Sequence, residues 1–580
     1  MRYRLTLLII PAFVTALLAV QVTHRYQSNN QISLRKINIQ KTIIRCSPDW
    51  NTIKNSLDEV DIPPIPGAGN YQWKITTTND SAQFYFNQGI NMYYGFHIIE
   101  AMASFKKAEK FDPNSAMIFW AKALTYGPNI NDFGYVATPD ALAAIERAIE
   151  LSTSCTLLEK KLINAQRVRY TSDTTQTREH LNQLYANEMK KVYTQFPDHA
   201  DAATLYADAL MLQHPWDLWY NNGQPKPWTP QIRSVLEKTI KKTPNHPGAN
   251  HYYIHVMEPS PFANLAIPSA DRLGNLTPAL SHMVHMPSHI YLRTGNYIKG
   301  SRVNETALKS YKKVTELYAP AKGADFLYVI HNLHMQTNHS MLAGKLNYSI
   351  QSAQELIKSI PADYLEFEGA LGNYVQYIFM TPVLVDVRFG RWDALLSKDK
   401  PDSKLKYAHV LFHFGRGMAF AHQNKIELAN EELKQLQQFI NDPVLALPFS
   451  PFSSALEGAT VAENLLNGTI SLKQKQYNNA INFFTKAVTI EENMVYNEPR
   501  DWLLNPKHYL GNAYLTIKDW KNAEKVFLND LKNNNNNIWA LTGLLKAYQN
   551  QKKEKAALTL FKKLKTISKN SDISITDPVF

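Results

Sequence analysis

The sequence predicts an all-α protein that folds as a helical repeat solenoid, and two observations lead to this prediction. A pattern of small and large residues recurs, since Ala101, Phe105 and Ala108 stand twelve, sixteen and nineteen positions after Gly89. Related spacings start from Gly417, Gly468 and Gly511. Only 22 of the 580 residues are glycine, which suits a helix-rich chain whose turns need few left-handed residues. Hydrophobic residues make up 44% of the chain, so it can bury a large core.

The first element along the chain is an apolar segment. Arg2 and Arg4 precede an uncharged run from Leu5 to Val22, which as a helix would be about 27 Å long, close to the ~30 Å hydrocarbon core of a bilayer. We expect residues 1–24 to be a signal peptide or a membrane anchor, with membrane association through residues 5–22 if the segment is not cleaved. A poor match to a small-residue cleavage site favours the anchor. The short basic start favours export, so the body is predicted to be periplasmic or secreted.

Residues 25–78 come next, and Pro63, Pro64 and Pro66 indicate a linker between the membrane and the solenoid. The chain has two cysteines, Cys46 in this segment and Cys155 further along. Two cysteines exclude a disulfide scaffold and a four-cysteine zinc site. They allow one bridge in an oxidising compartment, and the sequence does not determine whether it forms.

Helical segments fill the rest of the chain in four sections and a tail. These are N-terminal repeats at 79–200, an irregular histidine-rich region at 201–345, degenerate repeats at 346–456, C-terminal repeats at 457–567 and the tail at 568–580. Proline-rich insertions at 215–230 and 259–268 interrupt the central region. The asparagine run at 533–537 is interpreted as a loop without a functional role.

The recurring spacing has a physical meaning, because two antiparallel helices cross closely where glycine and alanine stand, while the large residue fills the groove to the next helix pair. It resembles the tetratricopeptide repeat, best in the segments Phe86 to Pro113, Leu465 to Ala487 and His508 to Phe527. The resemblance implies a concave surface that binds a protein or peptide partner. The net charge of +12 is spread along helix-like segments, so we predict no nucleic-acid partner.

Histidines are concentrated in the central region, where nine of the 18 in the chain lie between residues 246 and 339. Their spacing is helical: His251 and His255 are four apart with Glu258 on the same stripe, and His331 and His334 are three apart. Thr277 and Pro278 suggest the start of a further helix that carries His282, His285 and His289. Pro287 should kink or split that helix, so that His282 and His285 are aimed differently from His289.

Imidazole is the commonest metal ligand in proteins, and pairs at these spacings place two nitrogens on one side of a helix. We therefore predict a transition-metal site for copper, zinc or iron at one centre, formed by His251, His255, His285, His289, His331 and His334, with His282 and Glu258 as alternates. Met257, Met283, Met286 and Met335 are interleaved with them, and we interpret these as core residues.

Two functions remain open. The first is a scaffold that binds a partner on the solenoid and holds the metal structurally. The second is a metalloenzyme, either a copper or iron oxidase or a zinc hydrolase, in which the histidines leave one coordination position open. The chain contains no HExxH, GxSxG, Walker or GxGxxG motif, so no catalytic residue is assigned.

Several segments together resemble a group of exported bacterial tetratricopeptide-repeat proteins. The most specific are HYYIH at 251–255 and HMPSHIY at 285–291, and YNEPRDW at 496–502 also contributes. The resemblance covers residues 86 to about 551. It implies a periplasmic or secreted repeat protein and supplies no catalytic residues.

Overall fold

The computed structural model describes residues 47–132, 135, 137–322, 326–449 and 451–580, and this part of the chain is an all-α solenoid of the tetratricopeptide type. The described residues form no strand and contain only two isolated bridges, Trp219 with Pro225 and Phe449 with Phe452. None of the described helices has the length and apolar character of a membrane span. The predicted N-terminal segment at 5–22 and Cys46 lie outside the described residues, and Cys155 is buried and forms no disulfide with a described residue.

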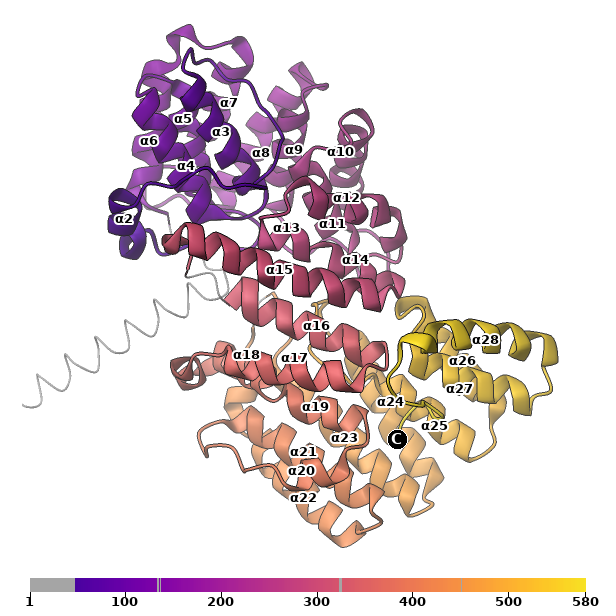
Figure 1. Cartoon of the computed structure of the whole chain (residues 1–580). Coiled ribbons are helices and arrows are strands. Elements are labelled where there is room, and N and C mark those ends of the chain that lie inside the picture. Colours follow the sequence, from indigo (N-terminus) through magenta and orange to yellow (C-terminus); the bar gives the residue numbers. More distant parts are fainter. Residues whose placement is uncertain (1–46, 133–134, 136, 323–325, 450) are drawn as a thin grey trace, which may run out of the picture.

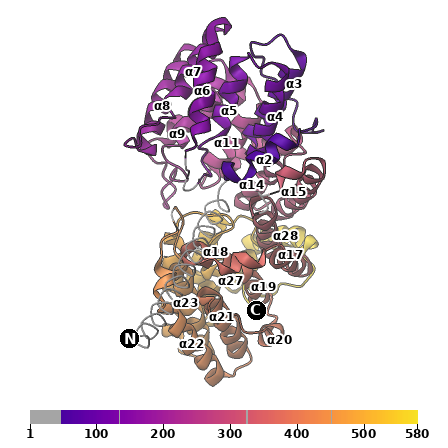
Figure 2. The same cartoon turned by 90° about the vertical axis from the view of Figure 1, so that its left-hand side faces the viewer.

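The first section of the solenoid runs along one end of the molecule (Figures 1 and 2). Its helices are α2 (Trp50–Glu59), α3 (Asp80–Tyr94), α4 (Ile98–Phe111), α5 (Ala116–Thr125), α6 (Pro139–Leu151), α7 (Leu157–Arg167), α8 (Arg178–Gln195), α9 (Ala200–Met211) and α10 (Thr229–Lys242). The expected linker differs from the structure after residue 46, because residues 47–78 include α2 and bury Ile62 and Trp73 in the same core as α3.

The central section is built from long and short helices and a π-helical turn. It contains α11 (Pro247–Met257), α12 (Ile267–Leu276), α13 (Ser281–His285), α14 (Pro287–Thr294), α15 (Tyr297–Leu317), a π-helical turn (Phe326–Ile330), α16 (His331–Leu342) and α17 (Leu346–Lys358). The split at Pro287 is confirmed, since α13 ends and α14 begins there. The expected helix start at Thr277 is wrong: these residues form a turn, in which the Leu280 amide donates to the Thr277 carbonyl.

The remaining helices form the opposite end and then return to the middle. They are α18 (Gly369–Phe379), α19 (Thr381–Arg388), α20 (Trp392–Leu396), α21 (Lys406–His422), α22 (Ile426–Ile440), α23 (Ala455–Lys473), α24 (Tyr477–Asn493), α25 (Pro506–Thr516), α26 (Trp520–Asn533), α27 (Ile538–Asn550) and α28 (Glu554–Ile567). Figure 1 shows the last of these, in yellow, beside α14 and α16. Two hydrogen bonds fix this return: Tyr297 Oη donates to the Asn535 carbonyl, and Trp539 Nε1 donates to the Met341 carbonyl.

The recurring glycines lie where helices touch, which explains why the spacing predicted the fold. A Cβ on Gly89 would lie 2.5 Å from the Phe105 ring, and one on Gly468 would lie 2.4 Å from the Phe484 ring. Phe527 packs between Gly511 of its own pair and Gly543 of the next one. Each phenylalanine therefore packs directly against the partner helix of its own pair, and Phe527 also packs against the next pair.

We expect Gly511→Ala to lower the stability of the protein by about 1 kcal/mol. The added Cβ would lie 2.4 Å from the Phe527 ring, and overpacking costs about 1–3 kcal/mol, partly offset by about 1 kcal/mol of helix propensity. Gly274→Ala is the matched control, because its nearest neighbour would be Val284 Cα at 3.7 Å. That variant should be as stable as the wild type or slightly more so. Thermal melts of the three proteins test this, and equal losses in both variants would contradict it.

Candidate metal centre

The fold gathers the predicted histidines in the buried middle of the solenoid, but in two groups and not at one centre. The first group is His251 and His255 of α11 with His282 of α13. The second is His285 at the end of α13, His289 of α14 and His331 at the start of α16. Within each group the ligand nitrogens all lie within 4.8 Å of one another.

The two groups divide within α13 and not at the break between α13 and α14, so the expectation that His282 and His285 are aimed together, away from His289, is wrong. His282 and His285 are three residues apart, yet His282 belongs to the first group, and His285 pairs with His289 across the break. His282, which the sequence suggested only as an alternate ligand, is thus one of the three histidines of the first group.

His334 lies outside both groups, and its ring packs against Tyr377 at 5.8 Å between centroids. Successive residues of an α-helix turn by about 100°, so side chains three apart diverge by about 60°. Of the two predicted ligands on α16, only His331 belongs to a group. The π-helical turn immediately before His331 changes the phase of the helix at this point, as such turns often do at functional sites.

In the first group, the Nδ1 atoms of two histidines are held by acceptors. His251 Nδ1 lies 2.6 Å from the Tyr94 carbonyl, and His255 Nδ1 lies 3.4 Å from Glu258 Oε1. Both partners can only accept a hydrogen bond, so each Nδ1 carries the proton and each Nε2 keeps its lone pair. The two Nε2 atoms are 3.0 Å apart. His282 Nε2 has no hydrogen-bond partner among the described residues.

The second group repeats this arrangement at His285 only, because His289 Nδ1 makes ion-pair contacts without a hydrogen bond. His285 Nδ1 lies 2.5 Å from Asn304 Oδ1, and the amide is oriented because Asn304 Nδ2 donates to the Gly300 carbonyl. His289 Nδ1 lies 3.0 Å from Glu258 Oε2 and 2.9 Å from Glu498 Oε2. The Nε2 atoms again converge, because His285 Nε2 is 2.8 Å from His289 Nε2 and 3.1 Å from His331 Nε2.

Burial and mutual repulsion keep most of these rings neutral. Burial lowers the pKa of His251, His282 and His285 well below the usual value, and neighbouring histidines lower it further. Burial also lowers the pKa of His331, to about 3. Neutral imidazole is the form that binds metal ions.

His289 and Glu258 are the exceptions, since each carries a charge at neutral pH in the metal-free protein. Burial raises the pKa of Glu258, but His289 and His255 outweigh it and lower this pKa to about 2. Burial lowers the pKa of His289, while Glu258 and Glu498 raise it to about 10. Burial raises the pKa of Glu498 to about 7 despite His289. Glu258 thus supplies the fixed negative charge of the centre.

Two aromatic residues in the left-handed backbone region cover the first group. Phe96 has φ of 57° and lies 4.6 Å from His251 and 6.0 Å from His255 between ring centroids. Trp216 has φ of 61° and lies 5.4 Å from His255. Bulky residues seldom adopt positive φ, and such strain collects at functional sites.

Sequence reasoning missed three partners of the histidines: the Tyr94 carbonyl, Asn304 and Glu498. Of these three, only Glu498 could have been suspected from the sequence, because it lies in the YNEPRDW segment. The four interleaved methionines are fully buried in hydrophobic core clusters, as expected of core residues.

No family model and no curated protein matches this chain. Among solved structures it is similar to human IFIT1 in a dimer with m7Gppp-AAAA, at 12% identity over 85% of this chain and 91% of that chain, with a TM-score of 0.30. It is similar to yeast Tom70 at 11% identity over 84% and 93%, with a TM-score of 0.30. A further match is the Cut9–Hcn1 hetero-tetramer of the APC/C, at 14% identity over 90% and 78%, with a TM-score of 0.25. These values carry no information about the histidine centre.

Proposed function

We propose that the protein is an exported helical-repeat scaffold whose centre binds two transition-metal ions, one at each three-histidine group. One observation supports this most strongly: acceptors at the Nδ1 atoms of His251 and His255 leave the bare Nε2 atoms of these two rings facing one another at 3.0 Å. Facing lone pairs in a buried site are unfavourable unless a cation lies between them. The Nδ1 partners are those that orient metal-bound histidine in proteins.

Copper and zinc are the ions that this ligand set fits best. The two groups offer imidazole nitrogens and no thiolate, and imidazole suits zinc, copper and iron. Among divalent first-row ions, copper binds such nitrogen sites most tightly.

The scaffold part of the proposal rests on the solenoid, whose stacked helix pairs form surfaces that bind a protein or peptide. A metalloenzyme is the second candidate, and the number of ligands favours it. Structural zinc sites are closed by four protein ligands, whereas catalytic ones have three and keep a position for water or substrate. Each group has three histidines, and Glu498 lies beside the second one as a group able to hold a proton.

Elemental analysis of the purified full chain tests the proposal, and we expect about two equivalents of copper, zinc or iron. His251→Ala with His255→Ala should remove one equivalent, and His285→Ala with His289→Ala the other. His180→Ala, at an exposed position, is the control and should retain both. A metal-free protein that melts normally and does not respond to a chelator would refute the metal centre and leave the scaffold alone.

A further inference from the structure

Two carboxylates and one imidazole meet beside the second histidine group. They belong to Glu258, which follows α11, to His289 of α14, and to Glu498 in the loop between α24 and α25. All three side chains are buried, and their ligand atoms all lie within 4.8 Å of one another. His289 Nδ1 is 3.0 Å from Glu258 Oε2 and 2.9 Å from Glu498 Oε2. The fold thus gathers two oxygens and one nitrogen from three distant parts of the chain.

These three atoms are close enough for hydrogen bonds, yet they form none. Glu258 Oε2, His289 Nδ1 and Glu498 Oε2 are each buried without a hydrogen-bond partner among the described residues. The two oxygens therefore lie off the direction in which Nδ1 would donate a proton. A cation does not need that alignment, because it is bound by atoms that surround it from several sides. Buried polar atoms without partners are unfavourable, so the arrangement points to an ion.

The charges of the two carboxylates support the same conclusion. Among the described residues, every ion pair of Glu258 and Glu498 is with a histidine. Arg293 is near enough to attract both carboxylates, but it forms no direct ion pair with either. In the metal-free protein the proton on His289 balances part of the negative charge, and a bound cation would release that proton to water.

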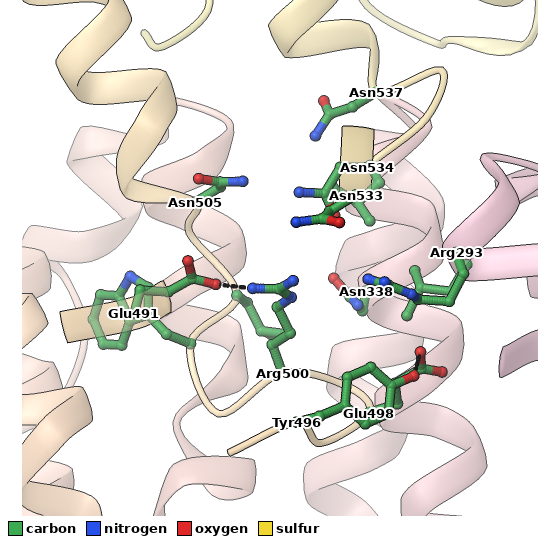
Figure 3. Close-up of a pocket in the computed structure, with 14 residues that line it drawn as sticks. Arg293, Asn338, Glu491, Tyr496, Glu498, Arg500, Asn505, Asn533, Asn534 and Asn537 are labelled. Carbon is green, nitrogen blue, oxygen red and sulfur yellow. Dashed lines mark hydrogen bonds and ion pairs between the residues drawn. The ribbon is translucent and has the colours of Figure 1, made fainter. Parts of the chain in front are cut away.

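The second oxygen of each carboxylate is held from outside the site. Glu258 Oε1 lies 3.4 Å from His255 Nδ1, and Glu498 Oε1 accepts a hydrogen bond from Tyr496 Oη. Figure 3 shows Glu498 and Tyr496 together at the adjoining pocket. Each carboxylate therefore presents one fixed oxygen to His289. Outer contacts of this kind orient metal ligands in proteins.

A small pocket beside Glu498 can hold further ligands. Its volume is about 30 Å³, which is room for about one or two water molecules. It adjoins an open cleft of about 550 Å³, and the two share Arg293, Tyr496 and Arg500 in their linings. The cleft gives a hydrated ion a path towards Glu498, and the pocket lets the ion keep water.

The distances indicate which kind of ion fits. Neighbouring ligand atoms of an octahedral ion, each about 2.1 Å from the metal, are about 3.0 Å apart. Ligand atoms of tetrahedral zinc, at about 2.0 Å, are about 3.3 Å apart. The 2.9 and 3.0 Å from His289 Nδ1 to the two oxygens match the octahedral ion. Carboxylates and water suit manganese, magnesium and calcium, and the imidazole favours the transition metal among these.

We propose that Glu258 Oε2, His289 Nδ1 and Glu498 Oε2 bind a third divalent cation of the manganese type, with water completing its coordination. This site goes beyond the two three-histidine groups and does not require that either is filled. His289 belongs to it through Nδ1 and to the second group through Nε2. When both sites are filled, the His289 ring bridges two ions and carries no proton.

Titration of the chelated full chain with Mn²⁺, followed by the electron paramagnetic resonance signal of free Mn²⁺, tests the proposal. We expect one Mn²⁺ to bind per chain. Glu498→Gln should weaken this binding at least about tenfold, because it removes a charged ligand. Glu432→Gln is the matched control, since it changes a buried carboxylate that accepts from His413, and it should leave Mn²⁺ binding unchanged.

His285→Ala removes a ligand of the second group and none of this site, so it should keep the Mn²⁺. If Glu498→Gln does not fold, Glu498→Asp keeps the charge on a shorter side chain and should also weaken binding. Absence of Mn²⁺ binding, binding as tight in Glu498→Gln or Glu498→Asp as in the wild type, or loss of binding in Glu432→Gln or His285→Ala would each overturn the proposal. Zinc binding by the same samples tests the histidine groups separately, so failure of one proposal is distinguishable from failure of the other.

Discussion

Replacing Glu258 by glutamine is expected to weaken metal binding at both histidine groups at once, by about 10- to 100-fold at each. One carboxylate oxygen accepts from His255 of the first group, and the other contacts His289 of the second. Glutamine offers one oxygen and one NH₂ group, so one of the two histidines would face a donor at Nδ1. That ring would move its proton to Nε2, the atom that should bind the metal. The other ring would keep an oxygen acceptor but lose its negative charge, so the ligands of both groups are weakened.

Two substitutions distinguish this mechanism from a general loss of structure. Glu498→Gln should weaken only the second group, because Glu498 contacts His289 and neither His251 nor His255. Glu432→Gln changes a buried carboxylate that accepts from His413 at 2.6 Å, in a remote part of the solenoid, and should leave metal affinity unchanged. Competition with a chromophoric chelator measures both affinities. Loss at only one group in Glu258→Gln would contradict the shared role.

The local part of this arrangement could be predicted from the sequence. The Gly, Ala and Phe spacing located the helix pairs because each glycine must accept a ring at short distance, as Phe484 does against Gly468. The four-residue spacing of His251 and His255 on one helix likewise follows from the helical period.

The long-range part could not be predicted in the same way. The break at Pro287 could be predicted. The sequence did not show that His282 would group with the histidines of α11 while His285 grouped with His289. Glu498 contacts His289 only because the chain folds back after α24. This return leaves no periodic pattern in the sequence. The turn that contains Asn535 accepts a hydrogen bond from Tyr297, which is far away in the sequence. Contacts of this kind depend on the curvature of the whole solenoid.

Acidification from pH 7.5 to pH 5 is expected to destabilise the metal-free protein, and His334→Leu should remove about 2 kcal/mol of that loss. His334 is 1% exposed, neither ring nitrogen has a hydrogen-bond partner among the described residues, and burial lowers its pKa from 6.5 to about 3. Between these values the unfolded chain binds a proton that the folded protein does not. Stability is therefore lost as the pH falls below 6.5, at about 1.4 kcal/mol per pH unit for one histidine.

Urea unfolding of chelated protein at both pH values measures this effect. At pH 7.5 His334 is neutral in both states, so His334→Leu should be close to the wild type, since leucine fills a similar volume without a polar group. At pH 5 the variant should be the more stable of the two. His180→Leu, at an exposed position, should show the same pH dependence as the wild type. His339, whose pKa burial also lowers to about 3, keeps part of the acid sensitivity in every variant. If the pH dependence were unchanged in His334→Leu, the His334 ring would gain its proton as readily in the folded protein as in the unfolded chain, and the prediction would be wrong.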